Sequence, residues 1–199
     1  MFKTSHLIAA LGLSALAAAA NAQTAADTAD MTQRDINQES RIRNGLQDGS
    51  LTTREAALLE KREGAADRMQ ANALKDGKLS DAERARITRA ENRNSRAITT
   101  ARGNGVDGNP LSASSQRMQA GVQRDINQQQ RIENGIQSGQ LSNKEAGQLE
   151  RGQARTDRQE FRAGRDGHVG AGEARAVNNA ENQQSARIHN KRHNAVTRG

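Results

Sequence analysis

The stretch RDINQESRIRNGLQDGSLTTREAALLE, from Arg34 to Glu60, returns 90 residues later as RDINQQQRIENGIQSGQLSNKEAGQLE, from Arg124 to Glu150. The match continues without a gap over 71 positions, of which 29 are identical. A duplication on this scale indicates two similar structural units in one chain.

The duplication divides the chain into parts of different composition. We expect a signal peptide at residues 1–22, helical repeat 1 at 31–102, a linker at 103–117 and helical repeat 2 at 118–195. The linker contains GNGVDGNPLSASS, whose Gly, Asn, Pro and Ser residues are typical of turns and flexible connections.

Each unit is predicted to contain three helices, which repeat 1 places at residues 31–47, 53–75 and 81–101. Their boundaries follow from one phrase that occurs four times, as DGSLTTRE, DGKLSDAE, SGQLSNKE and DGHVGAGE. In this phrase the Gly can end one helix in the left-handed conformation, and the Ser or Thr can cap the next helix. A Glu three residues after Thr52, Ser80 and Ser142 completes a capping box.

The predicted fold class is all-α, with two tandem three-helix units, a slim Ala-rich core and partial flexibility. Large apolar residues are few, and only 1% of the chain is aromatic. The apolar stripes are narrow, as in Ile87, Ala90, Asn94 and Ile98, which follow helical spacing but include a polar residue. Alanine at such positions permits close helix packing.

The N-terminus has the three parts of a secretory signal. Lys3 precedes an apolar run from Leu7 to Ala20, and Ala20-Asn21-Ala22 forms a small-residue cleavage site. We therefore predict cleavage after Ala22, a periplasmic or secreted location, and no membrane span in the mature chain. The absence of cysteine excludes disulfides and thiolate metal sites.

The repeated phrase also resembles the second half of an EF-hand calcium loop, in which Asp, Gly and Glu occupy positions 5, 6 and 12. The match is partial, since positions 1 and 3 before Asp48 are Asn44 and Leu46. Helix capping and binding of calcium or another divalent cation are therefore both open. The candidate metal ligands are Asp48, Glu55, Asp76, Glu83, Glu145, Asp166, Glu173, His189 and His193.

The residues near the C-terminus suggest which ligands and partners the protein could bind. His189 and His193 stand one helical turn apart, as two ligands of a metal site could, but the equivalent residues of repeat 1 are Thr99 and Gly103. Basic residues dominate this region, and the whole chain has a net charge of +7. We expect proteins or anionic envelope components as partners, an oligomer as an open alternative, and no nucleic acid, because aromatic stacking residues are lacking.

No catalytic motif is present, so we expect a protein that is not an enzyme. Its many carboxylates alternate with Arg and Lys at helical spacing, which favours exposed ion pairs on helix surfaces.

The run RIENGIQSGQLSNKEAGQLE, from Arg131 to Glu150, with the later AENQQSARI and KRHN, resembles an uncharacterised family of secreted proteobacterial helical-repeat proteins. LTTRE and LSNKE are also similar to the LTxxQ motif of periplasmic stress proteins, with Glu in place of Gln. These resemblances imply a helical fold, export, and a role in stress or metal tolerance.

Two functions follow from these observations. The first is a binding or chaperone-like role in the cell envelope. The alternative is an EF-hand-like protein that binds calcium or another divalent cation.

Overall fold

The computed structural model describes residues 7–194, and side-chain burial from residue 22 onward. The described residues form helices and no strands, which confirms the all-α prediction. The elements are α1 (Leu7–Asp48), α2 (Thr53–Ala73), the short 3-10 helix η1 (Leu74–Asp76), α3 (Asp81–Arg102), α4 (Ala113–Gln137), α5 (Asn143–Gly164) and α6 (Ala171–Arg192). Residues 1–6 of the predicted signal peptide, and Ala195 at the end of predicted repeat 2, lie outside the described residues.

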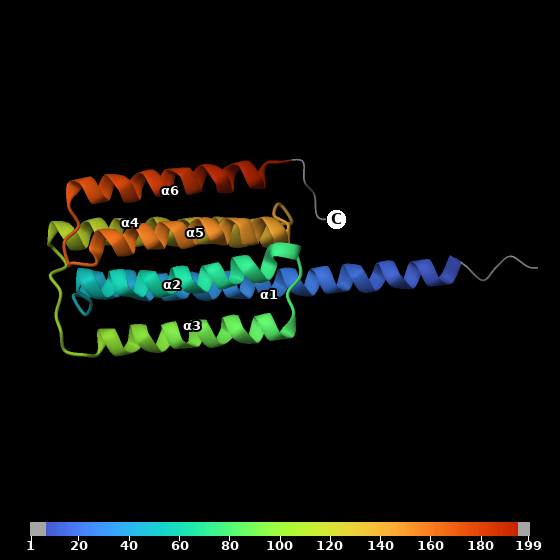
Figure 1. The fold of residues 1–199 in the computed structure, drawn as a ribbon, viewed down its shortest axis with the longest axis horizontal. Helices are drawn as coiled ribbons and strands as arrows, with labels where there is room; N and C mark the ends of the chain where they lie inside the picture. Colours follow the sequence, from blue (N-terminus) through green and yellow to red (C-terminus); the bar gives the residue numbers. More distant parts are fainter. Residues whose placement is uncertain (1–6, 195–199) are drawn as a thin grey trace, which may run out of the picture.

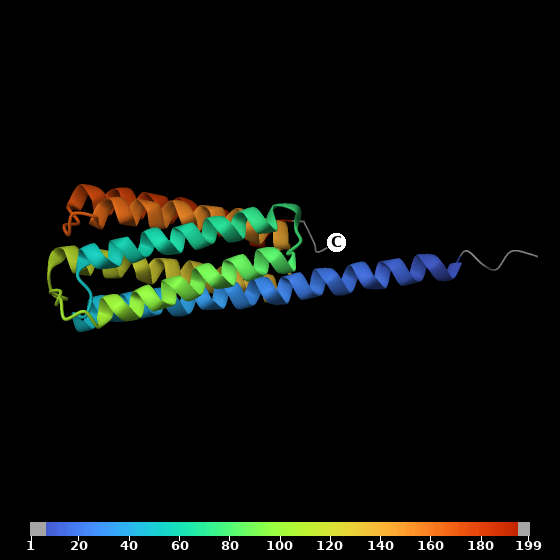
Figure 2. The same cartoon turned by 60° about the horizontal axis from the view of Figure 1, so that its bottom comes forward.

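Four helices form the centre of an elongated bundle, and the other two lie on opposite outer sides (Figures 1 and 2). The central helices are α1, α2, α4 and α5, while α3 packs on α1 and α2, and α6 packs on α4 and α5. The most extensive contacts join equivalent helices of the two repeats, α2 with α5 and α1 with α4, and each pair is antiparallel (Figure 1). The two repeats therefore share one core along the centre of the bundle.

The helix boundaries are set by the repeated phrase, as predicted. Thr52, Ser80 and Ser142 each accept a hydrogen bond from the backbone N–H three residues later, and the Glu at that position accepts from the backbone N–H of the cap. Gly49, Gly77, Gly139 and Gly167 have φ values of 81°, 86°, 79° and 90°. Only glycine adopts this left-handed region without strain, so the four turns depend on it.

Two boundaries differ from the prediction. Helix α1 is continuous before residue 31, because Thr24 and Thr28 are already buried against the bundle. Helix α4 begins at Ala113, inside the predicted 103–117 linker, because the Ser112 hydroxyl caps it by accepting from Ser115 N at 3.1 Å.

The apolar core lies mainly toward the two ends of the bundle. One cluster includes Leu46, Leu59 and Val122, and a second includes Leu74, Ile136 and Leu149. The predicted α3 stripe of Ile87, Ala90, Asn94 and Ile98 is buried as expected. Among the described residues, no helix has a stretch long and apolar enough to cross a bilayer.

Candidate metal centre

The buried face of α2 carries polar side chains between its apolar ends, and the same is true of α5. Their spacing of i, i+3, i+7 and i+10 places four residues of each helix on one face. They are Glu60, Glu63, Asp67 and Gln70 on α2, and Glu150, Gln153, Asp157 and Glu160 on α5. Because α2 packs against α5, these two faces lie in the interior of the bundle.

The other helices add further carboxylates to this interior. Eleven buried carboxylates occupy it: Asp35, Glu39, Glu60, Glu63, Asp67, Glu91, Asp125, Glu150, Asp157, Glu160 and Glu181. No Lys or Arg is buried among residues 22–194, and the only ion pair that reaches these eleven joins Arg34 to Glu91 at 2.7 Å. The expectation that the carboxylates form exposed ion pairs is therefore wrong for this set.

Two groups of three carboxylates come together in this interior. Site A consists of Asp35, Asp67 and Glu150, and site B consists of Glu60, Asp125 and Glu160. In each site one oxygen from every carboxylate lies within 4.8 Å of the others. Calcium binds oxygen at about 2.3–2.6 Å. Two oxygens on opposite sides of one calcium ion are therefore separated by twice that distance, which is close to the 4.8 Å within which the oxygens of each site lie.

The two sites are related by the sequence duplication. Asp35 of site A and Asp125 of site B differ by 90 positions, and so do Glu60 of site B and Glu150 of site A. Glu150 of repeat 2 thus completes a site whose other members belong to repeat 1. Neither site can form within one repeat.

Many oxygens in this interior have no hydrogen-bond donor. Both carboxyl oxygens of Glu60 and both of Glu160 lack one, as do Asp35 Oδ1 and Glu150 Oε1. A buried acceptor without a donor costs about 1–3 kcal/mol, and more when the acceptor is charged. Native proteins keep such groups rarely, and a bound ion is one explanation for them.

Buried glutamines give a second, independent indication of a cation. Gln70 Nε2 donates to Asp35 Oδ2 at 2.9 Å, Gln129 Nε2 to Glu150 Oε2 at 3.2 Å, and Gln153 Nε2 to Asp125 Oδ1 at 3.3 Å. Each amide oxygen is left without a donor of its own, although these residues are at most 2% exposed. An amide oxygen does not take up a proton near neutral pH, whereas a cation is a suitable partner for it.

Burial also raises the pKa values of these carboxyl groups. It raises the pKa of Asp125 to about 6, that of Glu150 to about 7 and that of Glu63 to about 8. Burial, reinforced by the charges of Glu150 and neighbouring carboxylates, also raises the pKa of Asp35 well above its ordinary value. Without a cation, several of these groups therefore hold protons near neutral pH, and a cation must displace those protons.

The outer helices cover the two sites with Glu91 of α3 and Glu181 of α6. Gln70 Nε2 lies 3.5 Å from Glu91 Oε1, which links Glu91 to site A. Glu181 accepts a hydrogen bond from Gln128 of α4. Arg34 pairs with Glu91, whereas the equivalent Arg124 donates to Asn178 Oδ1 at 2.7 Å. The two sites are therefore covered differently.

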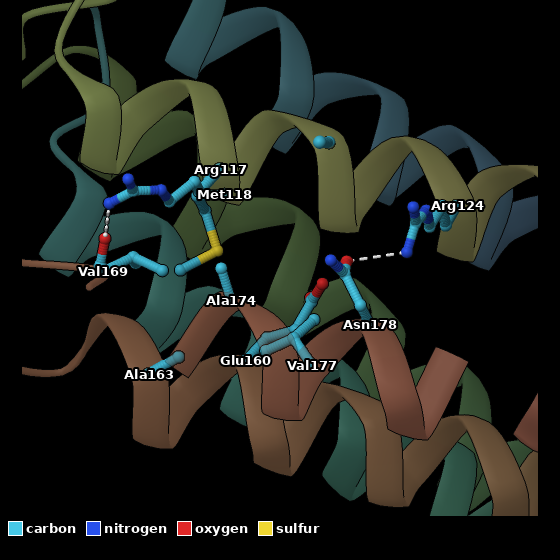
Figure 3. A pocket seen from close by; sticks show the side chains of 10 residues that line it. Arg117, Met118, Arg124, Glu160, Ala163, Val169, Ala174, Val177 and Asn178 are labelled. Atoms are coloured by element: carbon cyan, nitrogen blue, oxygen red, sulfur yellow. Dashed lines mark hydrogen bonds between the residues drawn. The ribbon is translucent and has the colours of Figure 1, made fainter. Parts of the chain in front are cut away.

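A cavity of about 130 Å³ lies between α4, α5 and α6 beside site B (Figure 3). Glu160 lines it together with Arg117 and Arg124. Arg117 donates to the Val169 carbonyl oxygen at 2.7 Å, and neither arginine forms an ion pair with Glu160. Glu160 therefore forms part of the cavity wall, although its two carboxyl oxygens are buried.

The candidate ligands predicted from sequence lie elsewhere. Asp48, Asp76 and Asp166 accept hydrogen bonds from backbone N–H groups two residues later, at 2.9, 3.0 and 2.9 Å, and thereby stabilise their turns. The four predicted glutamates, Glu55, Glu83, Glu145 and Glu173, accept from the backbone N–H at the start of their helices. These contacts confirm the capping interpretation, and cation binding by the loops stays a prediction.

The predicted histidine pair is brought together near the C-terminal end of α6. The rings of His189 and His193 stack with their centroids 4.3 Å apart. His193 Nδ1 lies 2.7 Å from the His189 carbonyl oxygen, so that nitrogen is engaged with the backbone. Neither histidine belongs to site A or site B.

Comparison with protein-family models, with curated proteins and with solved structures found no match. The family resemblances drawn from the sequence motifs therefore stay predictions, and function must be argued from the geometry of the chain itself.

Proposed function

We propose that this chain is a cation-binding protein that holds calcium, or a divalent cation of similar chemistry, in two buried sites at the centre of its helical bundle. One observation carries the proposal: two carboxylate triads, each assembled from both repeats and alike at two of their three positions, have oxygens without donors and adjoining glutamine oxygens without donors. The cation would therefore join the two repeats.

The donor atoms favour a hard cation. Both triads offer only carboxylate oxygens, and the glutamines that donate to them carry amide oxygens without donors. Zinc, copper and iron sites ordinarily include imidazole or thiolate, whereas calcium, magnesium and manganese favour carboxylate, carbonyl and water oxygens. Calcium also accepts six to eight ligands in flexible geometry, which suits a site built from three carboxylates and adjoining amides.

We further propose that the protein is not an enzyme and acts in the periplasm or outside the cell. The predicted cleavage after Ala22 supports this assignment, because Thr24, the first buried residue among residues 22–194, lies beyond the cleavage site. The chaperone-like role stays a prediction from sequence. Cation binding is preferred because the structure supplies a specific arrangement of groups for it.

Equilibrium dialysis of the purified protein against calcium at pH 8 tests the proposal. Two calcium ions should bind per chain, and two should still bind after the loop substitutions Asp76→Asn and Asp166→Asn. Failure to bind calcium, or loss of binding in the loop variants, would overturn the assignment to the bundle interior.

Gly121 provides a test that leaves every ligand unchanged. A Cβ atom at this position would lie 2.0 Å from Glu160 Oε1, so Gly121→Ala must displace the Glu160 carboxyl group. We expect calcium affinity at one site to fall at least tenfold while the other site is retained, as measured by calorimetry. Gly172→Ala is the matched control, because its Cβ would meet nothing within 4 Å. Equal affinities in the two variants would contradict the assignment of Glu160.

A further inference from the structure

We propose that the two sites differ in the cation charge they favour: site B preferentially binds a trivalent cation of about calcium size, whereas site A is a divalent site. This inference rests on the proposed function and deepens it. The differences between sites A and B at equivalent positions carry it.

Two amide-to-acid exchanges separate the sites. Gln70, which donates to Asp35 in site A, corresponds to Glu160 in site B. Gln129, which donates to Glu150 in site A, corresponds to Glu39, whose carboxyl group contacts that of Glu60. At a third pair the exchange runs the other way, because Gln153, which donates to Asp125 in site B, corresponds to Glu63, whose charge acts on Asp35 of site A. Site B thus has a net excess of one carboxylate over site A at these equivalent positions.

The contacts within site B require a positive charge or protons between acidic groups. Glu60 contacts Glu39 and Glu160, and Asp125 contacts Glu160. Both oxygens of Glu60 and of Glu160 lack a donor, and so does the amide oxygen of Gln153, which is 1% exposed and bonded to Asp125 through its nitrogen. The Gln153 oxygen is a neutral, buried acceptor on a side chain bonded to the triad, and a cation would supply the partner that it lacks.

The residues around the two sites also differ in how they compensate negative charge. In site A, Arg34 partly compensates the charge of Glu91. In site B, Arg124 donates to Asn178 and forms no ion pair with Glu181, although its charge still acts on that carboxyl group, which accepts from the neutral amide of Gln128.

Glycine provides space for the extra acid of site B. Gly121 faces Glu160, whose Oε1 stands where a Cβ would be 2.0 Å away. The equivalent residue of repeat 1 is Met31, a buried side chain in the apolar part of the core. The Glu160 carboxyl group therefore occupies a place that a side chain at position 121 would take.

Coulomb energy gives the direction of selectivity. The attraction between an ion and a carboxylate scales with the product of their charges, so each added carboxylate favours a trivalent ion over a divalent ion of the same size. The effect is stronger in a buried site, where water screens less. The net excess of one carboxylate therefore shifts site B toward the trivalent ion.

Competition between terbium, as the trivalent probe, and calcium tests this inference by equilibrium dialysis of the full protein at fixed pH. We expect one terbium ion per chain to remain bound in a calcium excess that displaces terbium from the other site. The paired substitution Glu39→Gln with Glu160→Gln makes site B resemble site A. It should lower the preference of that site for terbium over calcium at least tenfold, because it lowers terbium affinity more than calcium affinity.

The reverse exchange, Gln70→Glu with Gln129→Glu, should create a second site that retains terbium. This second variant keeps the inference testable if the variant with Glu39→Gln and Glu160→Gln fails to fold. Circular dichroism at pH 5 would show whether each variant folds. Terbium selectivity unchanged in both exchange variants would overturn the inference and leave the proposed function standing. Absence of binding by calcium and terbium alike would overturn both.

Discussion

The cation-free protein is expected to become less stable as the pH rises from 5 to 8, with its unfolding midpoint falling by roughly 10 °C. Burial raises the pKa values of Asp125, Glu150 and Glu63 to about 6, 7 and 8, whereas their ordinary values are 3.8 for Asp and 4.5 for Glu. The folded state therefore binds more protons than the unfolded state through this window. The stability that these groups contribute is fully present below pH 4 and is lost as the pH rises through their folded pKa values.

The size of the fall follows from the same linkage. One pKa unit corresponds to about 1.4 kcal/mol, and 1 kcal/mol shifts the midpoint of a domain of this size by roughly 2–4 °C. A net loss on the order of 3 kcal/mol is therefore enough to give the expected change. Asp48 has a pKa lowered by its hydrogen bonds from Ser50, so its contribution to stability increases with pH. That increase occurs below pH 5 and does not offset the fall between pH 5 and pH 8.

Calcium should cancel the fall, because it replaces the protons and binds only the folded state. Differential scanning calorimetry at pH 5 and pH 8, with a chelator and with millimolar calcium, measures both effects. A midpoint that rises from pH 5 to pH 8 in the chelator would contradict the burial of these acids. A fall that calcium leaves unchanged would contradict their role as ligands.

Neutralising site A should have opposite effects on stability and on binding. The isosteric variant with Asp35→Asn, Asp67→Asn and Glu150→Gln removes three ionisable groups from the interior. Burial raises the pKa of Glu150 to about 7, and one pKa unit corresponds to about 1.4 kcal/mol. Because an amide does not bear this cost of ionisation, the midpoint at pH 8 without calcium should rise by roughly 3–10 °C.

The same variant should bind one calcium ion per chain instead of two. Calorimetric unfolding and calcium titration of one preparation measure the two effects together. Asp81→Asn is the control, because the Asp81 side chain is 93% exposed and should change neither quantity. A variant less stable than the parent at pH 8 would indicate that the carboxylates stabilise the fold through protein contacts alone.

The sequence was sufficient for the fold class, the helix order and the caps, because these depend on local patterns. Thr52 and Glu55 lie three residues apart, and their reciprocal hydrogen bonds are formed as predicted. The same pattern could not show that the two repeats pack α2 against α5, since that contact is distant in sequence.

The candidate site was missed for a related reason. Glu60 is followed by Lys61 and Arg62, so its local sequence is that of an exposed helix face. The signal was the helical spacing of Glu60, Glu63 and Asp67, together with the retention of an acid at both copies of four positions. Those pairs are Asp35 with Asp125, Glu60 with Glu150, Asp67 with Asp157, and Glu91 with Glu181. Only the three-dimensional structure shows that Glu150 of repeat 2 lies beside Asp35 and Asp67 of repeat 1.

Anomalous X-ray diffraction from crystals grown with terbium or manganese tests the central claim most directly, because it locates the ion. Peaks are expected inside the bundle, between Glu60, Asp125 and Glu160 and between Asp35, Asp67 and Glu150, with protein oxygens at bonding distance. Peaks confined to Asp48, Asp76 or Asp166 at the surface turns, with the interior carboxyl groups bonded only to one another, would contradict it.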